Sequence, residues 1–258
     1  MPEDERSYRR RLEKEHSVEN IRKQLALPHK HSYLRDFIYG AVDGTVTTFA
    51  VVSSVAGASL QAEIVIIMGL ANLIGDGFSM AVSNFLGTRA QEQELENVRR
   101  HEKRHISVYP EGEREEIRQI FANKGFKGDD LEAAVRIVTS DRQEWVDTMI
   151  REEFGLATEV PKAWKSATTT FIAFLVIGIL PVLPFILTTF VEGIAINPYF
   201  WSVGMTMLAF FIVGAAKALV TAQSWIRSGL VTLAMGSSAA LLAYLVGMLL
   251  RGLVDSGI

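Results

Sequence analysis

Long apolar segments alternate with charged ones along this 258-residue chain. Five apolar segments are long enough to cross a bilayer, which takes about 20 residues in a helix. These segments are Phe37–Leu60, Ile64–Gly87, Ala167–Val191, Phe200–Val220 and Gly229–Leu250. No Lys or Arg occurs between Asp36 and Thr88. The pattern therefore predicts an all-α membrane protein with five transmembrane helices.

The connections between these spans also leave signals in the sequence. A tight turn is expected near Gln61–Glu63, and a short turn at Thr221–Ser228 should join the last two spans. Pro181 and Pro184 lie inside the third apolar segment. Because proline lacks the amide hydrogen that a helix needs, we expect a kink or an early end there.

Basic residues set the expected orientation, because loops rich in Lys and Arg stay in the cytoplasm. They crowd the first 35 residues and the block from Arg89 to Lys165, and Arg227 lies in the last turn. These parts should face the cytoplasm, and an odd number of spans leaves the C-terminus outside. The expected divisions are a charged cytoplasmic N-terminal segment (1–34), spans 1 and 2 (35–88), a cytoplasmic helical metal-binding domain (89–163), spans 3 to 5 (164–252) and a short outer tail (253–258).

The cytoplasmic insert reads as a bundle of three to four helices. Span 2 should continue as a helix to about His105 and break at Tyr109–Pro110. Further helices are expected at about 111–124 and 128–138. Ser140 and Gln143 form a possible capping box for a last helix, which stops at Gly155.

Composition narrows the function classes. The chain has no cysteine, which excludes disulfides, thiolate metal sites and thiol catalysis. A net charge of −3 gives no basic surface for nucleic acid. No phosphate-binding loop and no nucleophile–base pair stands out, so we do not expect an enzyme. The charged first 27 residues lack the apolar core of a signal peptide.

Three polar or thioether side chains share one face of the second span. Asn72, Asp76 and Met80 are four residues apart, and the first span carries a further acid, Asp43. A carboxylate at membrane depth usually marks an ion or proton path. A carboxylate, an amide oxygen and a thioether together suit a borderline-soft divalent metal. The glycines at 40 and 44 indicate either ordinary helix packing or a close helix approach around the acids, across a dimer axis.

The insert repeats this chemistry. Its candidate ligands are Glu102, His105, Glu113, Glu116, Met149, Glu152 and Glu153. Like charges one turn apart destabilise a helix unless a cation offsets them. Oxygen, imidazole and thioether ligands suit Fe(II), Mn(II), Co(II) or Zn(II). The alternative is a solvated ion-pair surface, which fits Glu92, Glu96, Glu111 and Glu115; the His101–His105 pair is a weaker signal.

Several motifs together resemble the vacuolar iron transporter family, also called the nodulin-21-like group, and its prokaryotic-type members in particular. The resemblance covers about Leu34 to Leu250. Its motifs are Tyr39-Gly-Ala-Val-Asp-Gly-Thr, Asp76-Gly-Phe-Ser-Met-Ala-Val, Tyr109-Pro-Glu-Gly-Glu-Arg-Glu-Glu-Ile, Trp145 through Met149 to Phe154-Gly155, Gly214-Ala-Ala-Lys and Arg227-Ser-Gly-Leu.

This resemblance implies a five-span homodimer with its pore between the subunits, which exports cytosolic ferrous iron, sometimes manganese, in exchange for protons. It implies transport-path roles for Asp43 and Met80. It implies cytoplasmic metal ligands at Glu102, Glu113, Glu116, Met149 and Glu153. The sequence departs from the family in three places. Asn72 stands at the position of the plant-type pathway glutamate. His105 and Ile150 stand at positions that are often acidic or metal-binding in the family. Asp76, one turn from Asn72, is expected to replace the glutamate.

The expected function is therefore secondary-active export of Fe(II), with protons, membrane lipid and a second copy of the chain as partners and no cofactor. A membrane-anchored metal sensor or buffer is the alternative of a different class. A manganese or broad-range divalent exporter is the alternative with the same architecture. The expected location is a prokaryotic plasma membrane, with a vacuolar membrane as the alternative.

Overall fold

The computed structural model describes residues 5–26, 32–192, 196–221 and 223–255, which form eleven helices and no strand. The chain divides into two compact units, residues 1–32 and 33–258. The first unit contains α1 (Glu5–Glu15) and α2 (Val18–Ala26). Both are charged helices with ion pairs between residues one turn apart, such as Arg9 with Glu13.

The second unit contains the long apolar helices. Helices α3 (Leu34–Gly57), α4 (Ala62–Val108), α10 (Pro198–Thr221) and α11 (Trp225–Asp255) contain stretches long and apolar enough to cross a membrane. Helices α8 (Ala163–Gly178) and α9 (Leu183–Phe190) form a pair bent by 57°, which gives a fifth span if the pair counts as one. The predicted interruption of the third apolar segment by Pro181 and Pro184 is confirmed.

Some helix boundaries differ from the sequence-based expectation. The turn between α3 and α4 falls at residues 58–61, earlier than expected, so Glu63 belongs to the first turn of α4. Ser59 adopts a positive φ of 56° there. The last residues of α11 lie within the predicted outer tail, so residues 253–255 are helical, and 256–258 lie outside the described residues.

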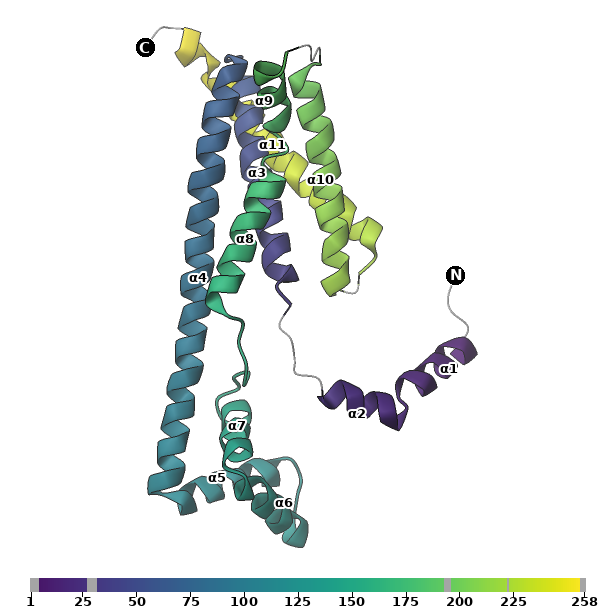
Figure 1. Cartoon of the computed structure of the whole chain (residues 1–258), viewed down its shortest axis with the longest axis vertical. Coiled ribbons are helices and arrows are strands. Elements are labelled where there is room, and N and C mark those ends of the chain that lie inside the picture. Colours follow the sequence, from purple (N-terminus) through teal and green to yellow (C-terminus); the bar gives the residue numbers. More distant parts are fainter. Residues whose placement is uncertain (1–4, 27–31, 193–195, 222, 256–258) are drawn as a thin grey trace. The chain divides into compact units, whose positions relative to one another are not determined.

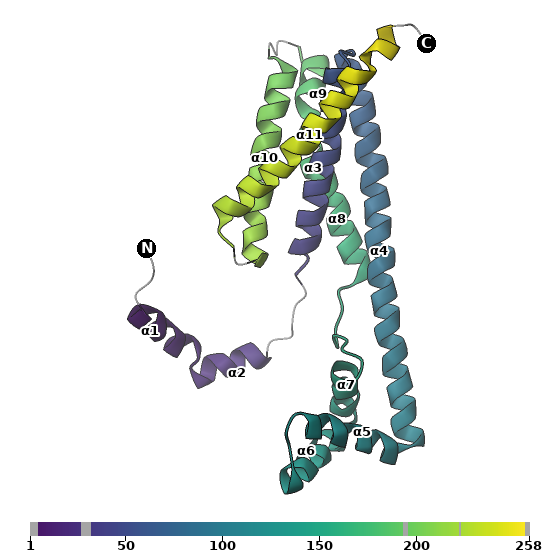
Figure 2. The same cartoon turned by 180° about the vertical axis from the view of Figure 1, so that it is seen from behind.

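Helix α3 is the central helix of this unit, packed against α4, α8, α10 and α11 (Figure 1). Figure 2 shows α11 running obliquely across α10 and α3. Glycines on α3 permit the closest approach to α8: a Cβ on Gly44 would lie 2.6 Å from the Phe174 carbonyl oxygen, and one on Gly40 would overlap the Thr170 carbonyl. Gly40 and Gly44 thus serve helix packing within one chain. A Cβ added to Gly75 of α4 would meet no other part of the described chain within 4 Å.

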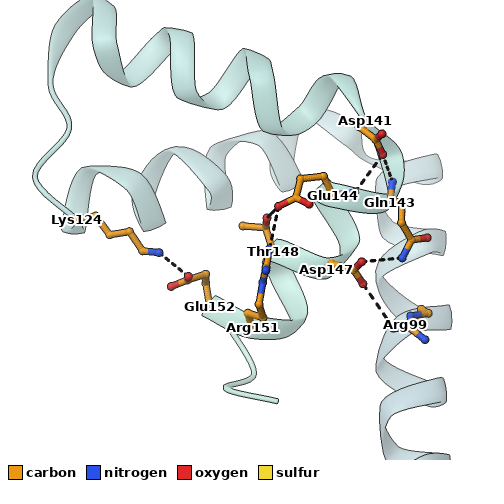
Figure 3. Close-up of polar contacts among 9 residues, drawn as sticks. All are labelled: Arg99, Lys124, Asp141, Gln143, Glu144, Asp147, Thr148, Arg151 and Glu152. Atoms are coloured by element: carbon orange, nitrogen blue, oxygen red, sulfur yellow. Dashed lines mark hydrogen bonds and ion pairs between the residues drawn. The ribbon is translucent and has the colours of Figure 1, made fainter. Parts of the chain in front are cut away.

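Helix α4 continues beyond its apolar part into the insert, as predicted (Figure 1). There α5 (Pro110–Asn123), α6 (Gly128–Ser140) and α7 (Arg142–Glu152) pack around a small apolar core that includes Ile117, Trp145 and Met149. The predicted capping box is wrong. Asp141 caps α7 instead, and its carboxylate accepts hydrogen bonds from the backbone amides of Gln143 and Glu144 (Figure 3). The Ser140 hydroxyl is not free for this role, because it donates to the Ile137 carbonyl.

Polar contacts tie the insert to α4. The Arg99 guanidinium donates to the Thr158 carbonyl at 2.8 Å and pairs with Asp147 of α7 at 3.5 Å (Figure 3). The Glu92 carboxylate accepts a hydrogen bond from the Ala163 amide at the start of α8, at 2.9 Å. These contacts hold the segment that returns the chain from the insert to the membrane.

Candidate functional site

A sharp turn brings the acids of α4 and α5 together. Tyr109 separates the two helices, and Pro110 opens α5 with the fixed φ that suits a first helical position. The Tyr109 ring lies against Gly112, where an added Cβ would clash with it. This turn places the last residues of α4 beside the first turn of α5.

A compact cluster of titratable groups results. His105 Nδ1 lies 3.2 Å from Glu113 Oε1 and 4.0 Å from Glu102 Oε1. Glu102 is only 2% exposed and Glu113 is 6% exposed. Two buried carboxylates therefore lie beside an exposed imidazole, which is costly unless a proton or a cation is shared between the carboxylates.

The pKa values reflect this cost. Burial, reinforced by the negative charges of Glu113, Glu153 and Glu116, raises the pKa of Glu102 to about 8. Burial and the charge of Glu116 also raise the pKa of Glu113, although His105 acts in the opposite direction. The raised pKa favours the neutral, protonated form of Glu102 near pH 7.

The two buried acids keep acceptor capacity that the protein does not use. No N–H or hydroxyl donor of the described chain reaches Oε2 of Glu102 or Oε2 of Glu113, and both atoms are buried. A buried polar atom without a donor is uncommon in folded proteins. A divalent cation would satisfy both oxygens, and the donor set of carboxylates and imidazole fits it chemically.

The remaining predicted ligands surround this pair unequally. Glu116 of α5 is exposed, but its charge acts on Glu102, Glu113 and Glu153. Glu153, at the end of α7, has a pKa raised by burial and by the charges of Glu116 and Glu113. Met149 lies one turn before Glu153 and is fully buried in the core of the insert.

Glu152 and His101 have contacts that set them apart from the other candidates. Glu152 forms an ion pair with Lys124 at the end of α5, and this contact occupies one of its carboxylate oxygens (Figure 3). His101, for which spacing gave only a weak signal, lies with Glu102 and His105 so that one potential ligand atom of each is within 4.8 Å of the others. The His101 and His105 rings are 4.2 Å apart between centroids.

A second set of polar side chains forms a seam between α3 and α4 in their apolar parts. Asp43 and Asp76 come close enough for their charges to interact. Toward one end, the Asn72 amide donates to the Thr47 hydroxyl at 3.3 Å. Toward the other end, the Asn84 amide donates to Asp36 at 3.2 Å.

These contacts follow from the antiparallel register of the two helices. Because the two helices run in opposite directions, successive turns of α3 contact successive turns of α4 in reverse order. Met80 belongs to the same half-buried stripe as Asn72 and Asp76. Sequence spacing predicted the stripe on α4, but the partners Thr47 and Asp36 depend on the pairing of helices. Beside the stripe, α4 exposes large apolar side chains, among them Ile74 and Phe78.

Comparisons of the sequence with known proteins point to one family. The VIT family profile matches residues 34–248. A protein named Vacuolar iron transporter 1 from Arabidopsis thaliana is 31% identical over 230 residues, which cover 86% of this chain and 90% of the relative. Proteins named Vacuolar iron transporter from Plasmodium berghei and Toxoplasma gondii are 30% and 28% identical, over 85% and 88% of this chain and 82% and 77% of the relatives.

Proposed function

The chain belongs to the VIT family, and we propose that it is a secondary transporter that carries ferrous iron out of the cytosol in exchange for protons. The observation that carries this proposal is the polar seam between α3 and α4, where Asp43 and Asp76 are close enough for their charges to interact, in helices apolar enough to span a membrane. A mere membrane anchor has no need for two acids in that place, because each is costly to bury. The relatives are named as iron transporters, which supports metal ions as the cargo.

The seam supplies a path with suitable ligands. Two carboxylates from adjacent helices repel each other unless a cation or a proton lies between them. Met80 adds a thioether one turn from Asp76, which favours Fe(II) over harder ions. Asn72 adds an amide oxygen on the same face, although its amide nitrogen is held by Thr47.

The insert acts as the capture site in this proposal. Glu102, Glu113 and His105 form its centre, with Glu116 and Glu153 adding negative charge at the exposed rim. Met149 is the soft ligand, and Glu152 and His101 are further candidates. Negative charge at the mouth of a path raises the local concentration of cations.

Protons provide the coupling. A metal ion needs deprotonated ligands, so a proton that reaches Asp43 or Asp76 from the far side displaces the ion. When the site opens to the cytoplasm again, the same aspartates release the proton there. The cycle needs no nucleotide, and the energy comes from the proton gradient.

The arrangement in the membrane is part of the proposal. We place the N-terminal segment and the insert in the cytoplasm and the C-terminus outside, since the basic residues gather on the cytoplasmic side. We assign the exposed apolar face of α4, with Ile74 and Phe78, to a second copy of the chain, so that the path is completed in a homodimer. A prokaryotic plasma membrane is the proposed location.

The charge on α4 offers a test of the path itself. The family glutamate falls at Asn72 here, and Asp76 is its proposed replacement one turn away. The double variant Asn72→Glu with Asp76→Gly should therefore retain iron transport, because the carboxylate only moves along the same face. Loss of transport by a variant that folds normally would mean that Asp76 has a role of its own.

Iron uptake into proteoliposomes with an acidic interior tests the function directly. The wild type should accumulate Fe(II), and Asp43→Ala should abolish uptake, whereas the exposed loop acid variant Glu192→Gln should not. Unchanged uptake by Asp43→Ala would reject the path. Metal binding without uptake by the wild type would favour the sensor or buffer alternative, and faster uptake of Mn(II) than of Fe(II) would favour the manganese exporter.

A further inference from the structure

A groove of about 480 Å³ lies between the beginning of α3 and the end of α10. Helix α3 begins at Leu34 and α10 ends at Thr221, so the groove lies where these spans leave their apolar part. Two basic side chains, Arg35 and Lys217, line it together with Ile38, Tyr39, Val42 and Val220. The groove is thus mostly apolar, with its charge supplied by two cations.

Within the part of the chain that the structure describes, no acid neutralises either cation. Among the described residues, Arg35 and Lys217 form no ion pair with an acid, and both are exposed. The nearest acid in sequence, Asp36, accepts a hydrogen bond from Asn84 of α4. The chain contains no acidic residue between Glu192 and Asp255, so neither α10 nor the described part of α11 before Asp255 offers Lys217 a carboxylate.

The charge of this groove separates it from the metal path. Two positive charges repel a divalent cation, so the groove does not serve as a branch of the seam between α3 and α4. A ligand for the groove must be anionic at the membrane surface and apolar below it. Basic pockets between transmembrane helices have this chemistry when they bind anionic lipid headgroups.

We propose that the groove binds one anionic phospholipid. Its phosphate lies between Arg35 and Lys217, and one acyl chain follows Ile38, Val42 and Val220 toward the membrane interior. The exposed ring of Tyr39 lies at the level where aromatic side chains contact headgroups. The bound lipid joins α3, which carries Asp43, to α10, and so stabilises the helix on which the metal path is built.

Native mass spectrometry of the purified protein with phosphatidylglycerol and phosphatidylcholine tests this site. The wild type should retain phosphatidylglycerol in preference to phosphatidylcholine. The variant Arg35→Gln with Lys217→Gln should lose affinity for phosphatidylglycerol by about fivefold per cation, or about 25-fold in total, and should bind phosphatidylcholine as before. The variant Arg35→Lys with Lys217→Arg should keep the preference.

Lys165 and Arg227 provide the matched control, because both are exposed cations at neighbouring span ends outside the groove. The variant Lys165→Gln with Arg227→Gln should behave like the wild type. Equal retention of both lipids by the wild type would overturn the proposal, and so would equal losses in the two double-glutamine variants. If the groove variant folds poorly, the unfolding temperature of the wild type tests the site instead. Phosphatidylglycerol should raise this temperature more than phosphatidylcholine does, and equal effects of the two lipids would overturn the proposal.

Discussion

The proton on Glu102 should leave when the insert binds metal, and the variant Glu102→Gln tests this. The pKa of Glu102 is raised to about 8 by burial and by neighbouring carboxylates, so the side chain is mostly protonated at pH 7. A group with this pKa is about 90% protonated at pH 7, and its proton must be removed before the carboxylate can bind an ion. Binding at pH 7 should therefore release up to about one proton from this site. The apparent affinity should fall about tenfold for each pH unit below 8 on account of this proton alone.

Calorimetric titration of the full chain in buffers of different ionisation enthalpy counts the released protons. The variant Glu102→Gln should release about one proton fewer than the wild type and should show a flatter dependence of metal affinity on pH. Glu111→Gln is the matched control, because Glu111 is exposed in the first turn of α5. Equal proton release by Glu102→Gln and the wild type would show that the proton of the Glu102–Glu113 pair is not linked to metal binding.

The proton on Glu102 should also make the folding stability of the protein depend on pH. The folded-state pKa of Glu102 lies above its ordinary value of 4.5, so the folded state holds more protons than the unfolded state between these values. The metal-free protein should therefore lose stability as pH rises from about 4.5 through 8. Glu102→Gln should reduce this loss, as measured by thermal unfolding across that range, whereas an unchanged pH dependence would show that Glu102 is not its source.

Two further predictions concern packing and ligand choice. Gly44→Ala should lower the unfolding temperature by about 5 °C, because its Cβ would meet the backbone of α8, whereas Gly75→Ala should not; equal unfolding temperatures would contradict the close contact. Glu153→Gln should weaken Fe(II) binding more than Glu152→Gln in the same titration, because Glu152 is paired with Lys124. The reverse order would place Glu152 at the metal.

Most of the membrane architecture could be predicted from sequence because it follows from local chemistry. Apolar length alone located every apolar helix, and Pro181 and Pro184 located the break between α8 and α9. Details that depend on local competition were less predictable. Asp141, rather than Ser140, caps α7, because two residues of similar capping ability stood next to each other.

The candidate sites were predictable only in part. Spacing along α4 gave the stripe of Asn72, Asp76 and Met80, since residues four apart share a helix face. Spacing could not give the contact of His105 with Glu113, which depends on the turn at Tyr109. Nor could it separate Glu152 from Glu153, because adjacent residues on a helix point in different directions and only the packing decides which faces the cluster.

The central claim is that iron crosses the membrane and that protons cross in the opposite direction. Its most direct test measures Fe(II) entry and internal pH in the same wild-type proteoliposomes, prepared with an acidic interior. We expect the interior to become more alkaline as iron enters, and we expect Asp43→Ala to abolish both changes together. Iron entry without any change of internal pH would contradict the exchange, and binding without entry would contradict transport.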